Sequence, residues 1–462
     1  MKERKFHMPT AYTILFLLLI LVAAATWIIP AGSYDYVDGV PVAGTYHAVE
    51  QNPQGVGDVL KAAFSGFYDA VDVCIFILMV GGFLGVVMKT GAVDAGVANV
   101  IRLLGGREKW LIPILMLLFG LGGTTYGMWE ETMAFYPLLI PVFLAAGYDA
   151  VVGISVILLG AGAGVIASTV NPFATGIAAG FAGVSLGEGI VLRLLEWVAF
   201  EAAAIWFVMA YAARIKRNPS KSVVGVGAGK IQVTMDQQVP FTAKRKVIMA
   251  FFTLTFLIMV YAVVPFDEMG LPLPTLGWWF PELSALFLAA GVVIGLIDRM
   301  GEEELVETYV AGCADLLGVA FIIGISRGIT VLMRDGAITD TILHWGEAAL
   351  SGAGAVSFTL LVFVLYLPLT ILIPSSSGLA TLSIPIVAPL GKFAGVGGDL
   401  VVTAFQSASG LVNILTPTAA VVMGALALGH VPYDRWVKYV WKLMLWFLLL
   451  ALVFLVAGVL LG

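Results

Sequence analysis

The sequence predicts an all-α polytopic membrane protein made of two inverted-topology repeats, with re-entrant hairpins and broken transmembrane helices. Three observations favour this fold class. Of the 462 residues, 60% are hydrophobic and only 12% are charged, whereas soluble domains carry about 25% charged residues. Several apolar runs approach the roughly 20 residues that a helix needs to cross a bilayer. Features of the first half also recur, in the same order, in the second half. This composition excludes an ordinary soluble enzyme and a disulfide-rich secreted module.

Residues 1–60 predict a first transmembrane helix followed by an external loop. The basic start MKERKFH precedes an apolar run over residues 12–30. A cleaved signal peptide is the alternative, but the run is long and ends without a small-x-small cleavage site. Residues 31–60 contain no Lys or Arg. By the positive-inside rule, this loop is outside and the N-terminus is cytoplasmic.

Residues 61–213 form the predicted first repeat, with apolar segments at about 68–88 and 110–121, a Pro- and Gly-rich broken region over 122–188 and a helix at 190–213. The linker 214–247 holds eight basic residues and one acid, so the positive-inside rule predicts that it is cytoplasmic. Neither this linker nor any other segment is a basic tract suited to nucleic acid.

Residues 248–305 are predicted to form two linking helices, at about 248–264 and 282–298. The second repeat then covers residues 306–462, with helices at about 310–333 and 352–373, a second broken region over 374–430 and a last helix at about 437–461. The additional helix at 282–298 reverses the direction in which the second repeat enters the membrane. Inverted repeats of this kind are typical of many secondary transporters.

Three features of the first repeat recur 245 to 248 residues later. They are the stretch MKTGA at 88–92, which returns as MRDGA at 333–337, the proline pair 137/141, which returns at 385/389, and the proline at 172, which returns at 417. Because the order is kept, an internal duplication explains the matches better than chance.

Two polar segments, 167–172 (ASTVNP) and 413–418 (NILTPT), interrupt apolar runs at equivalent places. Unpaired backbone groups are not tolerated in lipid, so an unwound segment there would face protein, water or substrate. Its carbonyls would suit a cation and the helix start after it an anion. A plain proline kink is the alternative. We expect substrate contacts from Asn171, Asn413, Thr416 and Thr418. No cofactor is expected, but a coupling ion, Na⁺ or H⁺, would bind near Ser168, Thr169, Asn171 and Thr416.

Two further polar clusters have the character of hairpin tips, at 124–132 and 375–378. They add to the predicted substrate site Glu130, Glu131, Thr132, Ser375, Ser376 and Ser377. Carboxylates at membrane depth are costly and are kept when they bind a cation, a proton or a charged substrate. A tip that reaches bulk water is the alternative reading of the two glutamates.

Other charged residues lie in apolar segments. Arg327 either receives a substrate carboxylate through two hydrogen bonds or pairs with an acid, and the sequence leaves both open. Arg193, Glu196 and Glu201 on the last helix of the first repeat predict a structural ion-pair face.

The runs YGMWEET at 126–132, FYPLLIP at 135–141, VNPF at 170–173 and IPSSSG at 373–378 resemble the YfcC-like branch of the C4-dicarboxylate anaerobic carrier (DcuC) family. The resemblance covers nearly the whole chain. It implies an ion-transporter-superfamily fold, a homodimer with elevator-type motion in the inner membrane, and substrates that range from C4-dicarboxylates to basic amino acids exchanged for one another.

The residues favour a secondary active transporter that works by alternating access, and not an enzyme. Two adjacent glutamates oppose a dicarboxylate, whereas a guanidinium or ammonium group pairs naturally with a carboxylate. We therefore expect a basic amino acid antiporter of the arginine/ornithine type. An ion-coupled carrier of C4-dicarboxylates, other amino acids or peptides is the alternative, and an ion channel is the alternative from a different class.

Overall fold

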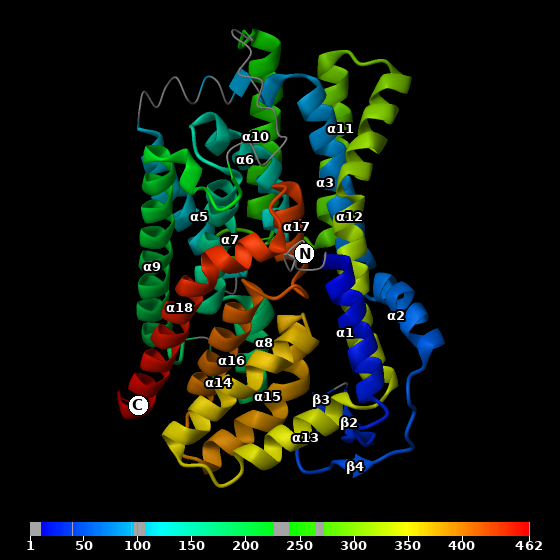
Figure 1. The fold of residues 1–462 in the computed structure, drawn as a ribbon, viewed down its shortest axis with the longest axis vertical. Coiled ribbons are helices and arrows are strands. Elements are labelled where there is room, and N and C mark those ends of the chain that lie inside the picture. Colours follow the sequence, from blue (N-terminus) through cyan, green and yellow to red (C-terminus); the bar gives the residue numbers. More distant parts are fainter. Residues whose placement is uncertain are drawn as a thin grey trace, which may run out of the picture.

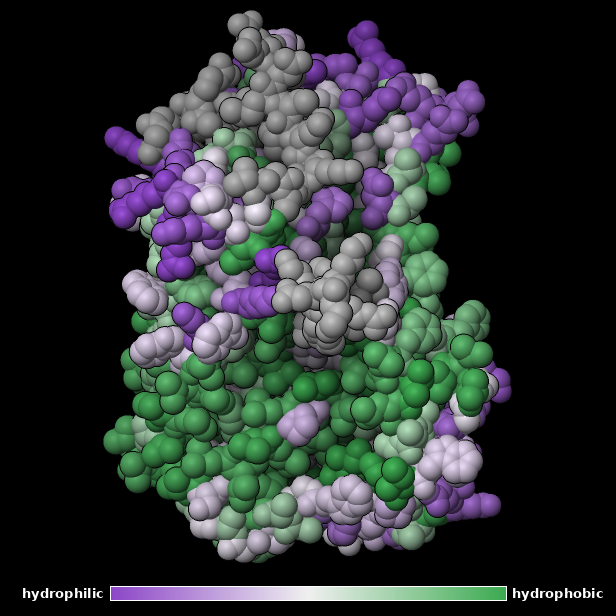
Figure 2. Space-filling model, viewed as in Figure 1, coloured by the Kyte–Doolittle hydropathy of each residue, from purple (hydrophilic) through white to green (hydrophobic). Residues whose placement is uncertain are grey.

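The computed structural model describes residues 11–38, 40–93, 95, 96, 99, 107–185, 187–225, 240–263, 266 and 272–461. Outside this part lie the basic start of the chain, residues 226–239 of the predicted linker and most of residues 264–271 between the two predicted linking helices. Within it, six helices are long and apolar enough to span a membrane. Figure 2 shows a broad hydrophobic band between hydrophilic ends. The prediction of an all-α polytopic membrane protein is confirmed.

The first group of helices packs on one side of the molecule (Figure 1). It consists of α1 (Ala11–Ala25), α2 (Val56–Asp69), α3 (Val71–Lys89), α11 (Phe280–Asp298) and α12 (Glu302–Asp335). Helices α3 and α12 approach closely because glycines face each other. A Cβ atom at Gly81 would lie 2.5 Å from the carbonyl oxygen of Gly312. Small residues at such crossings let helix backbones come together in a membrane.

The first broken region and its flanks form a series of helical elements. They are η1 (Glu108–Trp110), α5 (Leu111–Tyr126), η2 (Glu130–Phe135), α6 (Tyr136–Ala145), α7 (Ala150–Ile166), the π-helical turn η3 (Pro172–Gly176), α8 (Ile177–Ala182), the long helix α9 (Ile190–Arg217), η4 (Pro219–Lys221) and α10 (Ala243–Val263). Helix α7 therefore stops at the predicted polar segment and does not run on through it.

The second broken region and its flanks also form a series of helices. They are α13 (Thr339–Leu350), α14 (Ala355–Leu372), α15 (Ser376–Phe393), α16 (Gly398–Asn413), α17 (Ala420–Leu428) and α18 (Tyr433–Leu461). Helix α14 packs along α16 as α5 packs along α7. The first hairpin, α5–α6, lies in the upper half of Figure 1, and the second, α14–α15, lies in the lower half. The two hairpins thus enter from opposite ends, as an inverted repeat requires, while the domain boundaries at 61–213 and 306–462 stay predictions.

The loop between α1 and α2 contains short strands that the sequence did not predict. Strand β1 (Gly32–Ser33) pairs antiparallel with β4 (His47–Ala48), and β2 (Tyr36–Val37) pairs with β3 (Val40–Pro41). The loop is anchored on α13, because the amide of Tyr34 donates to Asp340 at 3.0 Å and its hydroxyl donates to Glu347 at 2.7 Å. Burial, together with the hydrogen bond to Glu347, raises the pKa of Tyr34.

The ion-pair face predicted on α9 is wrong in one of its three members. Arg193 lies in the electrostatic field of Asp399 and Glu196, and Glu196 accepts a hydrogen bond from the Ser407 hydroxyl at 2.8 Å. The carboxylate of Glu201 has no hydrogen-bond or ionic partner among the described residues. It faces helices that carry no charge at its level, so the charged pattern along α9 did not predict its surroundings.

Candidate functional site

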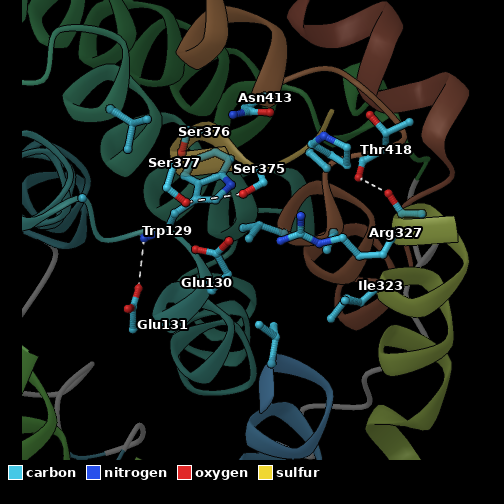
Figure 3. Close-up of a pocket in the computed structure, with 18 of the residues that line it drawn as sticks. Trp129, Glu130, Glu131, Ile323, Arg327, Ser375, Ser376, Ser377, Asn413 and Thr418 are labelled. Atoms are coloured by element: carbon cyan, nitrogen blue, oxygen red, sulfur yellow. Dashed lines mark hydrogen bonds between the residues drawn. The ribbon is translucent and has the colours of Figure 1, made fainter. Parts of the chain in front are cut away.

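A cavity of about 150 Å³ lies where the two hairpin tips and the two broken helices meet (Figure 3). Nine of the eleven residues predicted to bind substrate line it: Glu130, Glu131, Asn171, Arg327, Ser375, Ser376, Ser377, Asn413 and Thr418. The other two, Thr132 and Thr416, are buried and are not among the lining residues. Segments separated by more than two hundred residues in the chain therefore contribute to one cavity.

The first hairpin tip is a tight turn between α5 and η2. Gly127 adopts φ of 76°, a left-handed conformation that favours glycine. A side chain at this position would also overlap the Asn171 amide, since a Cβ atom would lie 2.5 Å from its nitrogen. The turn thus brings the first hairpin tip directly against the first helix break.

The two adjacent glutamates of this tip have different surroundings. Oε2 of Glu131 accepts a hydrogen bond from the backbone amide of Trp129 at 3.1 Å, and the residue is 5% exposed. In Figure 3 its carboxylate turns away from the centre of the cavity, whereas that of Glu130 points into it. The hydroxyl of Thr132, which the sequence placed in the site, instead donates to the Trp129 carbonyl.

The second hairpin tip presents serines at the start of a helix. Ser375 caps α15 by accepting a hydrogen bond from the Gly378 amide at 3.3 Å, and its hydroxyl lies 3.4 Å from that of Ser377. The N-terminus of α15 therefore faces the cavity with Ser375, Ser376 and Ser377 around it. A helix N-terminus carries a partial positive charge and unpaired amides, which favour an anion.

The first helix break is held by one threonine of α5. The hydroxyl of Thr124 donates to the Ala167 carbonyl at 2.8 Å, and the Thr124 carbonyl accepts from the Thr169 amide at 2.9 Å. These bonds satisfy backbone groups that the interruption of α7 leaves free. The Ser168 hydroxyl is buried and has no hydrogen-bond partner among the described residues.

The second helix break also contributes to the wall of the cavity, through Asn413 and Thr418. The hydroxyls of Thr416 and Thr418 lie 2.8 Å apart, and the Thr418 carbonyl accepts from Ser326 of α12 at 2.6 Å. Helix α17 starts directly after this segment, and Ala420 at its N-terminus lines the cavity. Of the residues predicted to hold a coupling ion, Thr169 thus contacts Thr124 and Thr416 contacts Thr418, while Asn171 reaches the cavity itself.

Arg327 brings a positive charge to the same cavity. It is carried by α12, which lies outside both hairpins, and its guanidinium points across the cavity toward the carboxylate of Glu130 (Figure 3). The cavity therefore combines one cation, one anion aimed inward, two helix N-termini and several hydroxyl and amide groups. Such a set can bind a molecule that carries both a carboxylate and a cationic group.

Several residues of the lining were not predicted from the sequence, Trp129 and the start of α17 among them. Trp129 lines the cavity beside the glutamates, and an indole face can attract a cation. Its position next to Glu130 was the available signal. The start of α17 at Ala419 and Ala420 contributes backbone, and no side-chain chemistry marks it in the sequence.

The family model for the C4-dicarboxylate anaerobic carrier, DcuC, matches residues 8–460. The chain is 35% identical to an uncharacterized protein of Haemophilus influenzae, over 99% of this chain and 98% of that protein. It is 30% identical to the Escherichia coli K12 protein named "Putative basic amino acid antiporter YfcC", over 94% of this chain and 93% of that protein.

Two solved transporter structures are also similar. The YdaH transporter of Alcanivorax borkumensis has a TM-score of 0.46 at 14% identity and covers 97% of this chain and 98% of its own. MtrF of Neisseria gonorrhoeae has a TM-score of 0.43 at 17% identity, and the match covers 97% of this chain and 94% of MtrF. The match of the family model over nearly the full length, together with the two sequence relatives, shows that this membrane transporter belongs to the C4-dicarboxylate anaerobic carrier (DcuC) family.

Proposed function

We propose that this protein is a basic amino acid antiporter of the arginine/ornithine type in the cytoplasmic membrane. The observation that carries the proposal is the pair of opposite charges, Glu130 and Arg327, on facing walls of one small cavity. A basic amino acid has a side-chain cation and an α-carboxylate. The first would pair with Glu130, and the second with Arg327 and the serines at the start of α15.

The electrostatics of the cavity also support exchange as the mode of transport. In an empty cavity, the partly dehydrated carboxylate of Glu130 and guanidinium of Arg327 have only each other, across the cavity, as counter-charges, which is costly in a membrane. A bound basic amino acid supplies both counter-charges. Movement between the two faces of the membrane would then be faster with a substrate bound, so import of one molecule accompanies export of another. A homodimer with elevator-type motion, and coupling to Na⁺ or H⁺, belong to the same proposal.

A C4-dicarboxylate is the second candidate, favoured by the anion-binding groups of the cavity. Arg327, the three serines and the N-terminus of α17 would all suit a carboxylate. The second carboxylate of such a substrate would, however, lie near Glu130 and be repelled by it. The family name supports this candidate, and the name of the Escherichia coli relative supports the basic amino acid.

Counterflow in proteoliposomes separates these functions. Vesicles loaded with unlabelled arginine, ornithine, succinate or alanine receive traces of each compound in labelled form. The proposal predicts accelerated uptake of arginine only when arginine or ornithine is inside. If only the uptake of labelled succinate is accelerated, and only by internal succinate, the result would favour the dicarboxylate carrier. Uptake of arginine that is independent of internal substrate would point to a channel.

A further inference from the structure

Glu201 is a buried acid that the substrate cavity does not use. It lies near the middle of α9, eleven residues after Ile190, which corresponds to about 16 Å along the helix. The residue is 2% exposed, and neither carboxylate oxygen has a hydrogen-bond partner among the described residues. It is absent from the cavity lining, so binding a substrate there gives it no counter-charge.

The elements packed against Glu201 offer no compensating charge. Helices α5 and α7, which pack against α9, contain no Asp, Glu, Lys, Arg or His. The four charged residues of α18 all lie in its first ten residues, where Tyr439 packs against Phe207 and Tyr211 of α9. At the level of Glu201, α18 instead packs through Phe447 against Phe200. On α9 itself the nearest charges are Glu196, five residues away and bonded to Ser407, and Arg193 beyond it. An ionised carboxylate is costly in such surroundings.

The carboxyl group of Glu201 instead rests on a glycine of α5. A Cβ atom at Gly120 would overlap the Glu201 carboxyl group, so the absence of a side chain there makes room for it. One turn further along α5, Thr124 holds the first helix break through Ala167 and Thr169. If α5 shifts when its packing against Glu201 changes, Thr124, one turn away on the same helix, would shift with it and disturb the first helix break.

We propose that Glu201 is a proton-binding site outside the substrate cavity, and that its proton is exchanged with water as the transporter changes conformation. In the conformation described here, the neutral carboxylic acid packs against Gly120. When α5 and α9 move apart and water enters, the acid releases its proton to water and becomes a carboxylate. Repacking of the two helices takes one proton up again. The inference rests on transport by alternating access and not on the identity of the substrate.

Infrared spectroscopy of the purified protein, compared between the wild type and its variants, tests the protonation of Glu201 directly and needs no substrate. The full-length wild type at neutral pH should show the C=O stretch of a protonated carboxylic acid, and the Glu201→Gln variant should lose this band. Glu201→Asp should retain an acid band at a shifted frequency. Glu303→Gln, which changes an exposed glutamate at the start of α12, should leave the protonated-acid band unchanged. A band that is identical in the wild type and Glu201→Gln would overturn the proposal.

The coupling is tested by proton release upon substrate addition in a weakly buffered solution with a pH-sensitive dye. Whichever compound shows counterflow should change the proton occupancy of the wild type, of Glu201→Asp and of Glu303→Gln, and this change should be lost in Glu201→Gln. Counterflow by Glu201→Gln should persist, because the amide mimics the neutral acid. An unaltered proton signal in a Glu201→Gln protein that still exchanges substrate would contradict the coupling. If arginine shows no counterflow in the wild type, the proposed substrate fails while the infrared result still decides the proton site.

Discussion

The backbone amide of Trp129 lies 3.1 Å from Oε2 of Glu131 and donates a hydrogen bond to it. Because only Glu131 accepts this bond, the two adjacent glutamates have different roles. Glu131 stabilises the turn that begins η2, and Glu130 is left to present its charge to the cavity, opposite Arg327 (Figure 3). The proposed pairing of Glu130 with a cationic substrate depends on this difference between the two glutamates.

The Glu131→Gln substitution should lower the stability of the protein and leave its affinity for arginine nearly unchanged. An amide oxygen can still accept from Trp129, but a neutral acceptor is weaker than a carboxylate, by on the order of 1 kcal/mol. We expect a lower midpoint of thermal unfolding in detergent and an arginine KM close to that of the wild type. A KM that rises as strongly as in Glu130→Gln would show that Glu131 also contacts the substrate.

The Gly127→Ala substitution should impair transport by disturbing Asn171. An alanine at positive φ costs about 1–2 kcal/mol, and here its Cβ atom would also overlap the Asn171 amide. Gly183→Ala is the matched control, because Gly183 has φ of 69° and open space around its Cβ position. Counterflow should fall sharply in Gly127→Ala and remain near normal in Gly183→Ala. Equal activity in the two variants would mean that contact with Asn171 does not matter.

Asn171→Ala and Thr416→Ala should both reduce transport at normal expression, and Asn171→Ala should do so more strongly. Asn171 lines the cavity, whereas Thr416 acts through its bond to Thr418. The loss of a single neutral hydrogen bond costs about 1 kcal/mol, or roughly a fivefold change in affinity. Kinetics of both variants in proteoliposomes check this ranking. Wild-type kinetics in both would remove the helix breaks from the account of the site.

Arg327 should recognise the α-carboxylate of the substrate. In the wild type, the decarboxylated analogue of arginine should compete with labelled arginine far less well than arginine does. In Arg327→Gln the difference between the two competitors should shrink, by about tenfold or more, because a charge-assisted hydrogen bond contributes about 1.5–3 kcal/mol. A preserved preference in this variant would assign Arg327 a structural role, the other possibility that the sequence left open.

The sequence predicted the positions of the hairpin tips and helix breaks because proline, glycine and polar residues are tolerated within apolar membrane segments only where the backbone faces protein, water or substrate. It did not separate Glu130 from Glu131, since both follow the same turn and only the Trp129 amide selects one. It also placed Glu201 in an ion-pair face, because spacing along α9 does not show what the neighbouring helices carry. Those helices, α5 and α7, reach α9 only through tertiary packing, which a linear pattern does not encode.

The central claim, that Glu130 pairs with a cationic substrate, is tested most directly by arginine counterflow in Glu130→Gln proteoliposomes, with Glu131→Gln reconstituted in parallel. The substitution keeps the shape of the side chain and removes its charge. The account predicts that Glu130→Gln loses arginine/ornithine exchange, with an affinity at least about tenfold weaker, while Glu131→Gln retains it. Arginine exchange by Glu130→Gln at the wild-type rate and affinity would contradict the account, and a gain of succinate exchange in that variant would favour the dicarboxylate carrier.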